Sequence, residues 1–167
     1  MSADPPPEDL VPEDAHPRAR EALGDRFFWD ANDTGSPLGG DTGVEVLDAF
    51  RDFRAAEPKG NPVTLLDELL ETWEVENAHW DAVSEAEVHE LGRDDEFSLL
   101  TRDEALLALV FAQIVVEGKV QHELHRRALL CLKRQQLPAL LHGWGDRRLE
   151  RALRLERMRE ILARPWD

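Results

Sequence analysis

The segment FFWDANDTGSPLGGDTG, residues 27–43, contains the residue types that bind hard cations. Oxygen-bearing side chains stand at positions one, three, five and twelve of a stretch within it, namely Asp30, Asn32, Thr34 and Asp41. This is the spacing of a calcium-binding loop between two helices, in which alternate oxygen atoms converge on the cation. Gly35, at position six, would allow the sharp turn that such a loop needs. One interpretation of the segment is therefore a Ca²⁺ site formed by these four residues.

Departures from the calcium pattern favour a second interpretation. Thr34 offers a single neutral oxygen, Asp41 is shorter than the bidentate glutamate that ends such loops, and the sequence has no second loop of this kind. In the second interpretation the loop is structural, with Asp and Asn side chains holding its turns. Asp41 or Thr42 would then cap a helix that begins near Val44. We favour the structural loop, expect no cofactor, and keep calcium as the alternative.

The aromatic residues of the same segment indicate a binding surface. Phe27, Phe28 and Trp29 cannot all point inward from one short segment unless helices enclose it, so we expect at least one to be partly exposed. Exposed aromatic side chains mark binding surfaces. The candidate binding residues are the aromatic and polar side chains of the loop: Phe28, Trp29, Asp30, Asn32, Asp33 and Asp41.

Two further groups have the residue types of a reactive or metal site. His122 and His125 are three residues apart on a predicted helix and could reach one metal ion. Their spacing is not that of the zinc proteases, and we interpret them as polar residues of an exposed helix face. Cys131 lies among leucines and is interpreted as a core thiol. We therefore assign no catalytic residue.

The elements that must position these residues have helical periodicity. The strongest signal is the segment 101–118, where Thr101 and Glu104 have capping-box spacing and Gly118 is a stop signal. Because its body is apolar on every side, this helix belongs in the centre of a bundle. Its expected buried residues are Leu106, Leu109, Val110, Phe111, Ile114 and Val115.

Further helical patterns begin near residues 44, 62, 84, 121 and 145. The sequence therefore predicts an all-α fold, a single-domain bundle of about six or seven helices around the central apolar helix, over residues 15–167. Residues 1–14 are rich in proline and acidic side chains and are expected to form a mobile tail.

The charge of the chain is unevenly distributed. The net charge is −15, but the segment from Lys119 onward has 12 basic and 6 acidic residues. The basic helices should pack on the acidic part or pair along its surface. Alternatively, the acidic face binds a protein partner, which would be basic. Nucleic-acid binding is disfavoured because phosphate recognition requires concentrated Lys and Arg.

The start of the chain lacks the pattern of a secretion signal, and its longest apolar run is shorter than the about 20 residues of a bilayer helix. The single cysteine agrees with a reducing compartment. We expect a cytoplasmic protein that has no membrane partner.

Five strings carry a resemblance to a known family: AHPRA at 15–19, FFWD at 27–30, SPLGGDTG at 36–43, LDAFRDFR at 47–54 and FAQIVVEGKV at 111–120. Together they resemble a YfeS-like family of bacterial proteins, sometimes labelled as related to a molybdate-metabolism regulator. The resemblance implies a bacterial cytosolic protein of unknown role and makes the 27–43 loop a family feature. It transfers no functional residue.

These observations leave two hypotheses of function. The favoured one is a non-catalytic binding or regulatory protein that acts through its acidic surface and the 27–43 loop. The alternative is a metal-dependent protein or enzyme centred on Asp30 to Asp41. A pocket in which titratable groups converge would support the alternative.

Overall fold

In the computed structural model, which describes residues 8–167, helices joined by short irregular segments make up the chain, and no strand occurs in that range. The all-α prediction is confirmed. The helices, including three short 3-10 helices (η), are η1 Pro12–Asp14, α1 Pro17–Ala22, η2 Arg26–Trp29, α2 Gly40–Ala56, α3 Pro62–Thr72, α4 Glu85–Glu117, α5 His122–Gln135, α6 Pro138–Leu141, η3 His142–Arg147 and α7 Arg148–Leu162. None of these described helices is long and apolar enough to cross a membrane.

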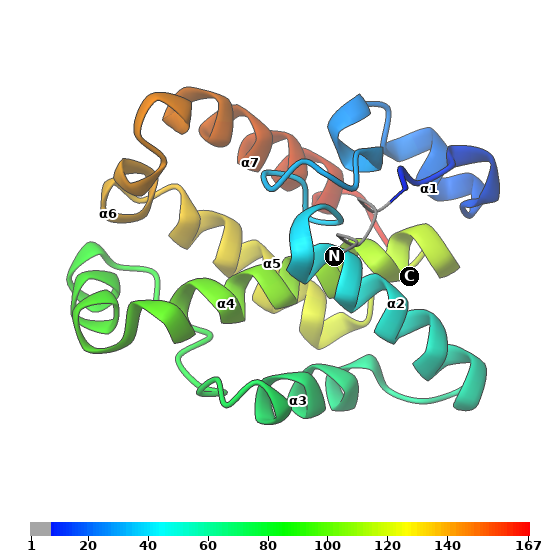
Figure 1. Ribbon diagram of the computed structural model, residues 1–167, viewed down its shortest axis with the longest axis horizontal. Helices are drawn as coiled ribbons and strands as arrows, with labels where there is room; N and C mark the ends of the chain where they lie inside the picture. Colours follow the sequence, from blue (N-terminus) through cyan, green and yellow to red (C-terminus); the bar gives the residue numbers. More distant parts are fainter. Residues whose placement is uncertain (1–7) are drawn as a thin grey trace, which may run out of the picture.

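The second half of α4 is the centre of the bundle. In Figure 1, α4 runs through the middle of the molecule, with α3 below it and α7 above it. It packs mainly against α2 and α5, and α5 packs in turn against α7. The six residues predicted to be its buried core are all 3% exposed or less, which confirms the central apolar helix.

Helix α4 joins the helix predicted near residue 84 to the central helix predicted over 101–118. Ser84 caps it: the Glu87 amide donates to Ser84 Oγ at 3.2 Å, and that hydroxyl donates to the Glu87 carboxylate at 2.8 Å. The helix is interrupted at Asp95, whose φ and ψ are −158° and 82°. The Asp95 carboxylate accepts hydrogen bonds from the Ser98 amide and hydroxyl, so it caps the second half of α4. The predicted cap at Thr101 is wrong, because Thr101 lies within the second half of α4, which begins after Asp95.

Helix α2 begins at Gly40 with Gly39 as its N-cap, so the prediction that Asp41 or Thr42 caps a helix starting near Val44 is wrong. The reason is the close approach of the preceding loop. A Cβ on Gly39 would lie 2.1 Å from the Asp33 carbonyl oxygen, and a Cβ on Gly43 would lie 2.6 Å from the Leu38 carbonyl carbon. Asp41 instead lies in the first turn of α2, where its charge is favourable to the helix dipole.

Ion pairs join the basic C-terminal helices to the acidic part of the chain, as the charge distribution predicted. Arg134 pairs with Asp103 at 2.7 Å, Arg154 with Asp33 at 2.7 Å, and Arg157 with Asp25 at 3.0 Å. The first of these pairs is buried and the other two hold the N-terminal loops on α7.

The structure bears on the tail prediction only for residues 8–14, since residues 1–7 lie outside the described range. The Leu10 amide donates to the Trp29 carbonyl oxygen at 2.9 Å, and its side chain packs, partly buried, against the core. The Asp9 carboxylate accepts a hydrogen bond from the Ala31 amide at 3.2 Å. Residues 9 and 10 are thus bonded to the 27–43 segment, which the sequence did not indicate.

Candidate ligand-binding cleft

The aromatic residues of the 27–43 segment lie mostly in the core. Phe28 is fully buried and stacks on Phe111, with ring centroids 5.4 Å apart. Trp29 is also buried, and its indole N–H donates to the Leu23 carbonyl oxygen at 2.8 Å. Phe27 is partly buried beneath the Arg154 guanidinium, in agreement with the expectation that one of the three would be partly exposed. Two of the six candidate binding residues, Phe28 and Trp29, are therefore part of the hydrophobic core.

The acidic residues of the segment are held by nearby donors. Asp33 accepts hydrogen bonds from the Gly35 amide and from Arg154, both at 2.8 Å. Burial opposes ionisation of Asp33, but the bonds from Arg154 and Gly35 prevail and lower the pKa of its carboxyl. The Asp30 carboxylate accepts from the Asn32 amide at 3.0 Å. Asn32 and Asp41 are exposed, as is Thr34.

No group of three or more His, Cys, Asp or Glu side chains within residues 8–167 is placed to hold a metal ion. The calcium interpretation of Asp30, Asn32, Thr34 and Asp41 stays a prediction. Of the histidines on α5, His125 has a ring nitrogen 2.6 Å from the Leu162 carbonyl oxygen, whereas His122 is exposed. Cys131 is fully buried, and burial raises the pKa of its thiol, as expected for a core residue.

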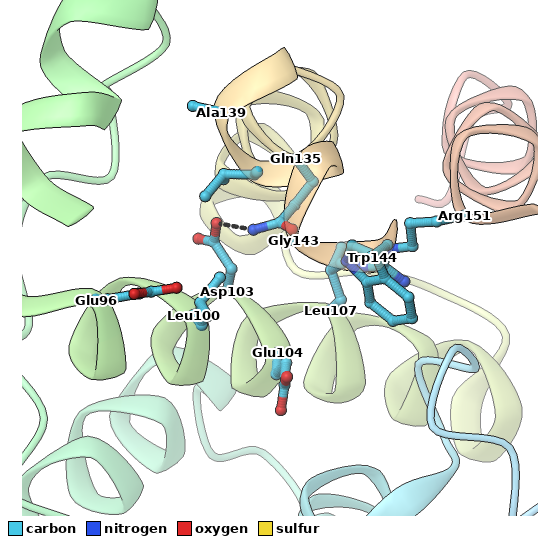
Figure 2. Close-up of a pocket in the computed structure, with 11 residues that line it drawn as sticks. Glu96, Leu100, Asp103, Glu104, Leu107, Gln135, Ala139, Gly143, Trp144 and Arg151 are labelled. Atoms are coloured by element: carbon cyan, nitrogen blue, oxygen red, sulfur yellow. Dashed lines mark hydrogen bonds between the residues drawn. The ribbon is translucent and has the colours of Figure 1, made fainter. Parts of the chain in front are cut away.

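The second half of the loop lines a cleft that the sequence did not reveal. A cavity of about 390 Å³ opens between α4, the end of α5, α6, η3 and α7 (Figure 2). A smaller one of about 40 Å³ continues it towards the loop. The two share four lining residues, Glu104, Leu107, Trp144 and Arg151. The loop residues on the smaller cavity are Thr34, Ser36, Pro37 and Gly39.

Arg151 is a buried cation in the wall of this cleft. It is 8% exposed, and burial lowers the pKa of its guanidinium. Its Nη1 donates a long bond of 3.4 Å to the Gly35 carbonyl oxygen, and its buried Nε has no hydrogen-bond partner. The Trp144 ring lies 4.5 Å from the guanidinium carbon, and Figure 2 shows the two side chains next to each other. Within residues 8–167, Arg151 forms no ion pair.

Asp103, which also lines the cleft, is paired with a fully buried arginine that does not line it. Arg134 Nε and Nη2 donate to the two oxygens of Asp103 at 3.0 and 2.7 Å, and Nη1 donates to the carbonyl oxygens of Trp80 and Ala82. The Gln135 amide donates to Asp103 at 2.6 Å, the bond that Figure 2 marks. Both Asp103 oxygens are therefore occupied by donors.

Glu104 is a carboxyl of the cleft whose pKa is shifted by its surroundings. It is accessible to solvent, yet desolvation by the surrounding walls raises the pKa of its carboxyl. A hydrogen bond with Thr42 and the charge of Arg151 oppose this rise. Titratable groups thus converge here, the observation we expected of an enzyme, but they do not belong to the predicted set Asp30 to Asp41.

The sequence contained one signal for this cleft. Arg151 occupies the buried stripe of α7, which continues through Leu155, Met158 and Leu162 at spacings of three and four residues. An arginine in such a stripe must find a partner or a cavity. The other residues of the cleft come from separate elements, and no local pattern brings them together.

Comparison with curated proteins finds a relative in Escherichia coli (strain K12). Over 133 residues, 79% of the chain, the identity to "Uncharacterized protein YfeS" is 30%. The match includes 54% of that relative, so the chain spans about half of its length. No protein-family model matches the chain, and no solved structure matches it. The name of this relative gives no activity and lends no support to the molybdate label. On this match, the chain belongs to a YfeS-like family.

Proposed function

We propose that this protein is a non-catalytic binding protein and that the cleft bounded by loop 34–43, α4, η3 and α7 is its binding site. The observation that carries the proposal is the buried Arg151, which has no ion-pair partner within residues 8–167 and lies on the wall of a cavity of about 390 Å³. Pockets of this size hold small molecules. In this proposal the 27–43 segment belongs to the site through residues 34–43, several of which line the smaller cavity.

The contacts in the cleft support binding more than catalysis. General acid–base chemistry needs a carboxyl that is free to exchange a proton with the substrate. Both Asp103 oxygens accept hydrogen bonds from Arg134 and Gln135, so this carboxylate is not free. Glu104 and Arg151 can bind and orient a ligand, and a binding function requires no more of them.

The test is to incubate the protein with a small-molecule extract of host cells and to detect retained ligand by native mass spectrometry. We expect the wild type and Arg148→Met to retain a ligand and Arg151→Met to lose it. Arg148 is the matched control because it is an exposed arginine on α7 that does not line the cleft. Equal retention by both variants, or retention by none of the three proteins, would refute the cleft as the site. Conversion of extract components by the wild type would favour the enzyme alternative.

A second candidate function has support elsewhere on α4. A hollow of about 390 Å³ is lined by five exposed carboxylates, Glu76, Glu87, Glu90, Asp94 and Asp95. Clustered charge of one sign attracts a partner of the other and fixes its orientation. A basic segment of a partner protein fits this surface, in line with the partner expected from the sequence.

A fluorescent peptide rich in lysine and arginine tests this second function. We expect salt-sensitive binding that weakens in the double variant Glu90→Gln/Asp94→Asn. The control is Glu45→Gln/Asp48→Asn, which removes the same charge from exposed positions on α2. Equal weakening in both pairs would show that only net charge is sensed, and the hollow would not be a site.

A further inference from the structure

We infer that the ligand of the cleft is a small monocarboxylate with an apolar body, bound through its carboxylate to Arg151 and packed by its body against Trp144. This inference rests on the proposed function of the cleft as a binding site. It adds the chemical class of the ligand, which three properties of the cleft determine: its unpaired cation, its two carboxylates and its apolar wall.

The unpaired cation requires an anion. A buried charge is tolerated when it is paired and hydrogen bonded, as Arg134 is by the two oxygens of Asp103. Arg151 is also buried, at 8% exposed, but it makes only a 3.4 Å bond to a carbonyl oxygen. The planar guanidinium matches a carboxylate with two parallel hydrogen bonds. A ligand carboxylate would therefore give Arg151 the negative charge and the two hydrogen-bond acceptors that Asp103 gives Arg134.

The carboxylates of the cleft limit the ligand to one negative charge. Glu96 and Glu104 line the same cavity and form no ion pair within the described chain. The two carboxylates repel any anion in proportion to its charge, so they repel a dianion such as phosphate about twice as strongly as a monocarboxylate. A monocarboxylate balances Arg151 and adds no second charge near Glu104.

The remaining wall is apolar. Its side chains are Leu100, Leu107, Ala139, Leu140 and Trp144. A ligand that fills the cavity must cover this surface, and an apolar body gains free energy by doing so, whereas a polar body would lose hydrogen bonds to water. The volume of about 390 Å³ admits a ring or a short chain.

Trp144 is placed to respond when the ligand enters. It lies between Gly143 and Gly145, and a Cβ added to either glycine would meet no atom within 4 Å, so the turn is free of packing at both sides. Gly145 has a φ of +54°, which favours glycine. The Trp144 ring lies 4.5 Å from the guanidinium carbon, so a carboxylate that binds this guanidinium changes the surroundings of the ring.

A second buried arginine, Arg102, also has an unpartnered Nε, at the acidic hollow. Its Nη1 donates to the Glu76 carbonyl oxygen at 2.8 Å, a shorter bond than that of Arg151. The carboxylates of that hollow repel an anion. Arg151 is therefore the anion-binding residue that the geometry favours.

The experiment is a titration of the wild type with three carboxylates, benzoate, hexanoate and 3-phenylpropionate, followed by calorimetry and tryptophan fluorescence. The comparators are benzylamine, which has a positive charge, inorganic phosphate, which can carry two negative charges, and acetate, which lacks the large apolar body. We expect at least one of the three carboxylates to bind with one-to-one stoichiometry and more tightly than every comparator. Failure of all three carboxylates, or tighter binding of phosphate or benzylamine, overturns the inference without the use of any variant.

Variants then locate the site. Arg151→Met should weaken carboxylate binding about tenfold or more, the effect of losing hydrogen bonds to a charged group, while Arg148→Met should leave it unchanged. In Trp144→Phe, calorimetry should still detect carboxylate binding, but the change in tryptophan fluorescence should be lost. Unchanged affinity in a folded Arg151→Met places the carboxylate elsewhere and overturns the assignment. A ligand retained from cell extract through Arg151, together with failure of the three carboxylates, would leave the proposed function standing and refute only the ligand class.

Discussion

Two buried arginines, Arg151 in the wall of the cleft and Arg134 behind Asp103, should differ in their response to the same substitution. Arg134 has four hydrogen bonds, two of them to the buried Asp103, whereas Arg151 has one long bond and an unpartnered Nε. Methionine keeps most of the length of the arginine side chain and removes its charge. Arg134→Met leaves the Asp103 carboxylate buried without its counter-ion, and breaking such a pair costs about 3 to 5 kcal/mol. Arg151→Met removes a charge that was already unpaired, so we expect a change within about 1 kcal/mol, or a gain in stability.

Urea unfolding of the two variants and the wild type, without added ligand, measures the difference. With equal slopes, the shifts in midpoint give the changes in free energy of unfolding directly. The difference between the two variants should be at least about 2 kcal/mol. A loss in Arg151→Met that equals or exceeds the loss in Arg134→Met would show that Arg151 contributes to the folded state through contacts of its own, and the case for an anion site would fall with it.

Four further outcomes are expected. Phe111→Ala should lower the free energy of unfolding by about 3 to 5 kcal/mol, and a loss under about 1 kcal/mol in chemical denaturation would contradict its central place. Millimolar calcium should leave the melting temperature unchanged, whereas a real site at about one hundred times its dissociation constant would add about 2.7 kcal/mol, which Asp30→Ala would abolish. Deletion of residues 1–7 should leave the melting temperature within a few degrees. Deletion of residues 1–14 should lower it measurably, because the hydrogen bonds of Asp9 and Leu10 to the 27–43 segment are lost. Because the pKa of Asp33 is lowered on folding from 3.8, its contribution to stability is present above that pH and lost as the pH falls through the folded value; urea unfolding between pH 5 and pH 2 should show a slope that Asp33→Asn reduces.

The parts of the fold that the sequence predicted are those governed by local patterns. Burial of Phe111 and its neighbours followed from an apolar helix with no polar face, and the helical pattern near residue 84 marked the start of α4, where Ser84 is the N-cap. The capping-box spacing of Thr101 and Glu104 was misleading, because such spacing does not distinguish the true start of a helix from a position inside it. Asp95 took that role through its bonds to Ser98, and only the bend in the chain reveals it.

The candidate site was harder to predict because its residues come together from distant parts of the chain. Arg151 and Gly35 are 116 residues apart and are joined by a hydrogen bond, and Arg154 reaches Asp33 over a similar interval. The loop was singled out correctly as unusual, but its glycines serve close backbone approach, and its aromatic rings fill the core. The position of an arginine in the buried stripe of α7 was the one local sign that a cavity or a partner lay nearby.

The buried Arg134 has a consequence for how the two hollows of the molecule should be studied. Through Nη1 it holds the carbonyl oxygens of Trp80 and Ala82, in the irregular segment that borders the acidic hollow, and through Nε and Nη2 it holds Asp103 in the wall of the cleft. Its side chain therefore links the borders of the two hollows by hydrogen bonds at both ends of the guanidinium. A substitution at Arg134 loosens both surfaces at once, so a binding defect in such a variant would not tell which surface had met the ligand.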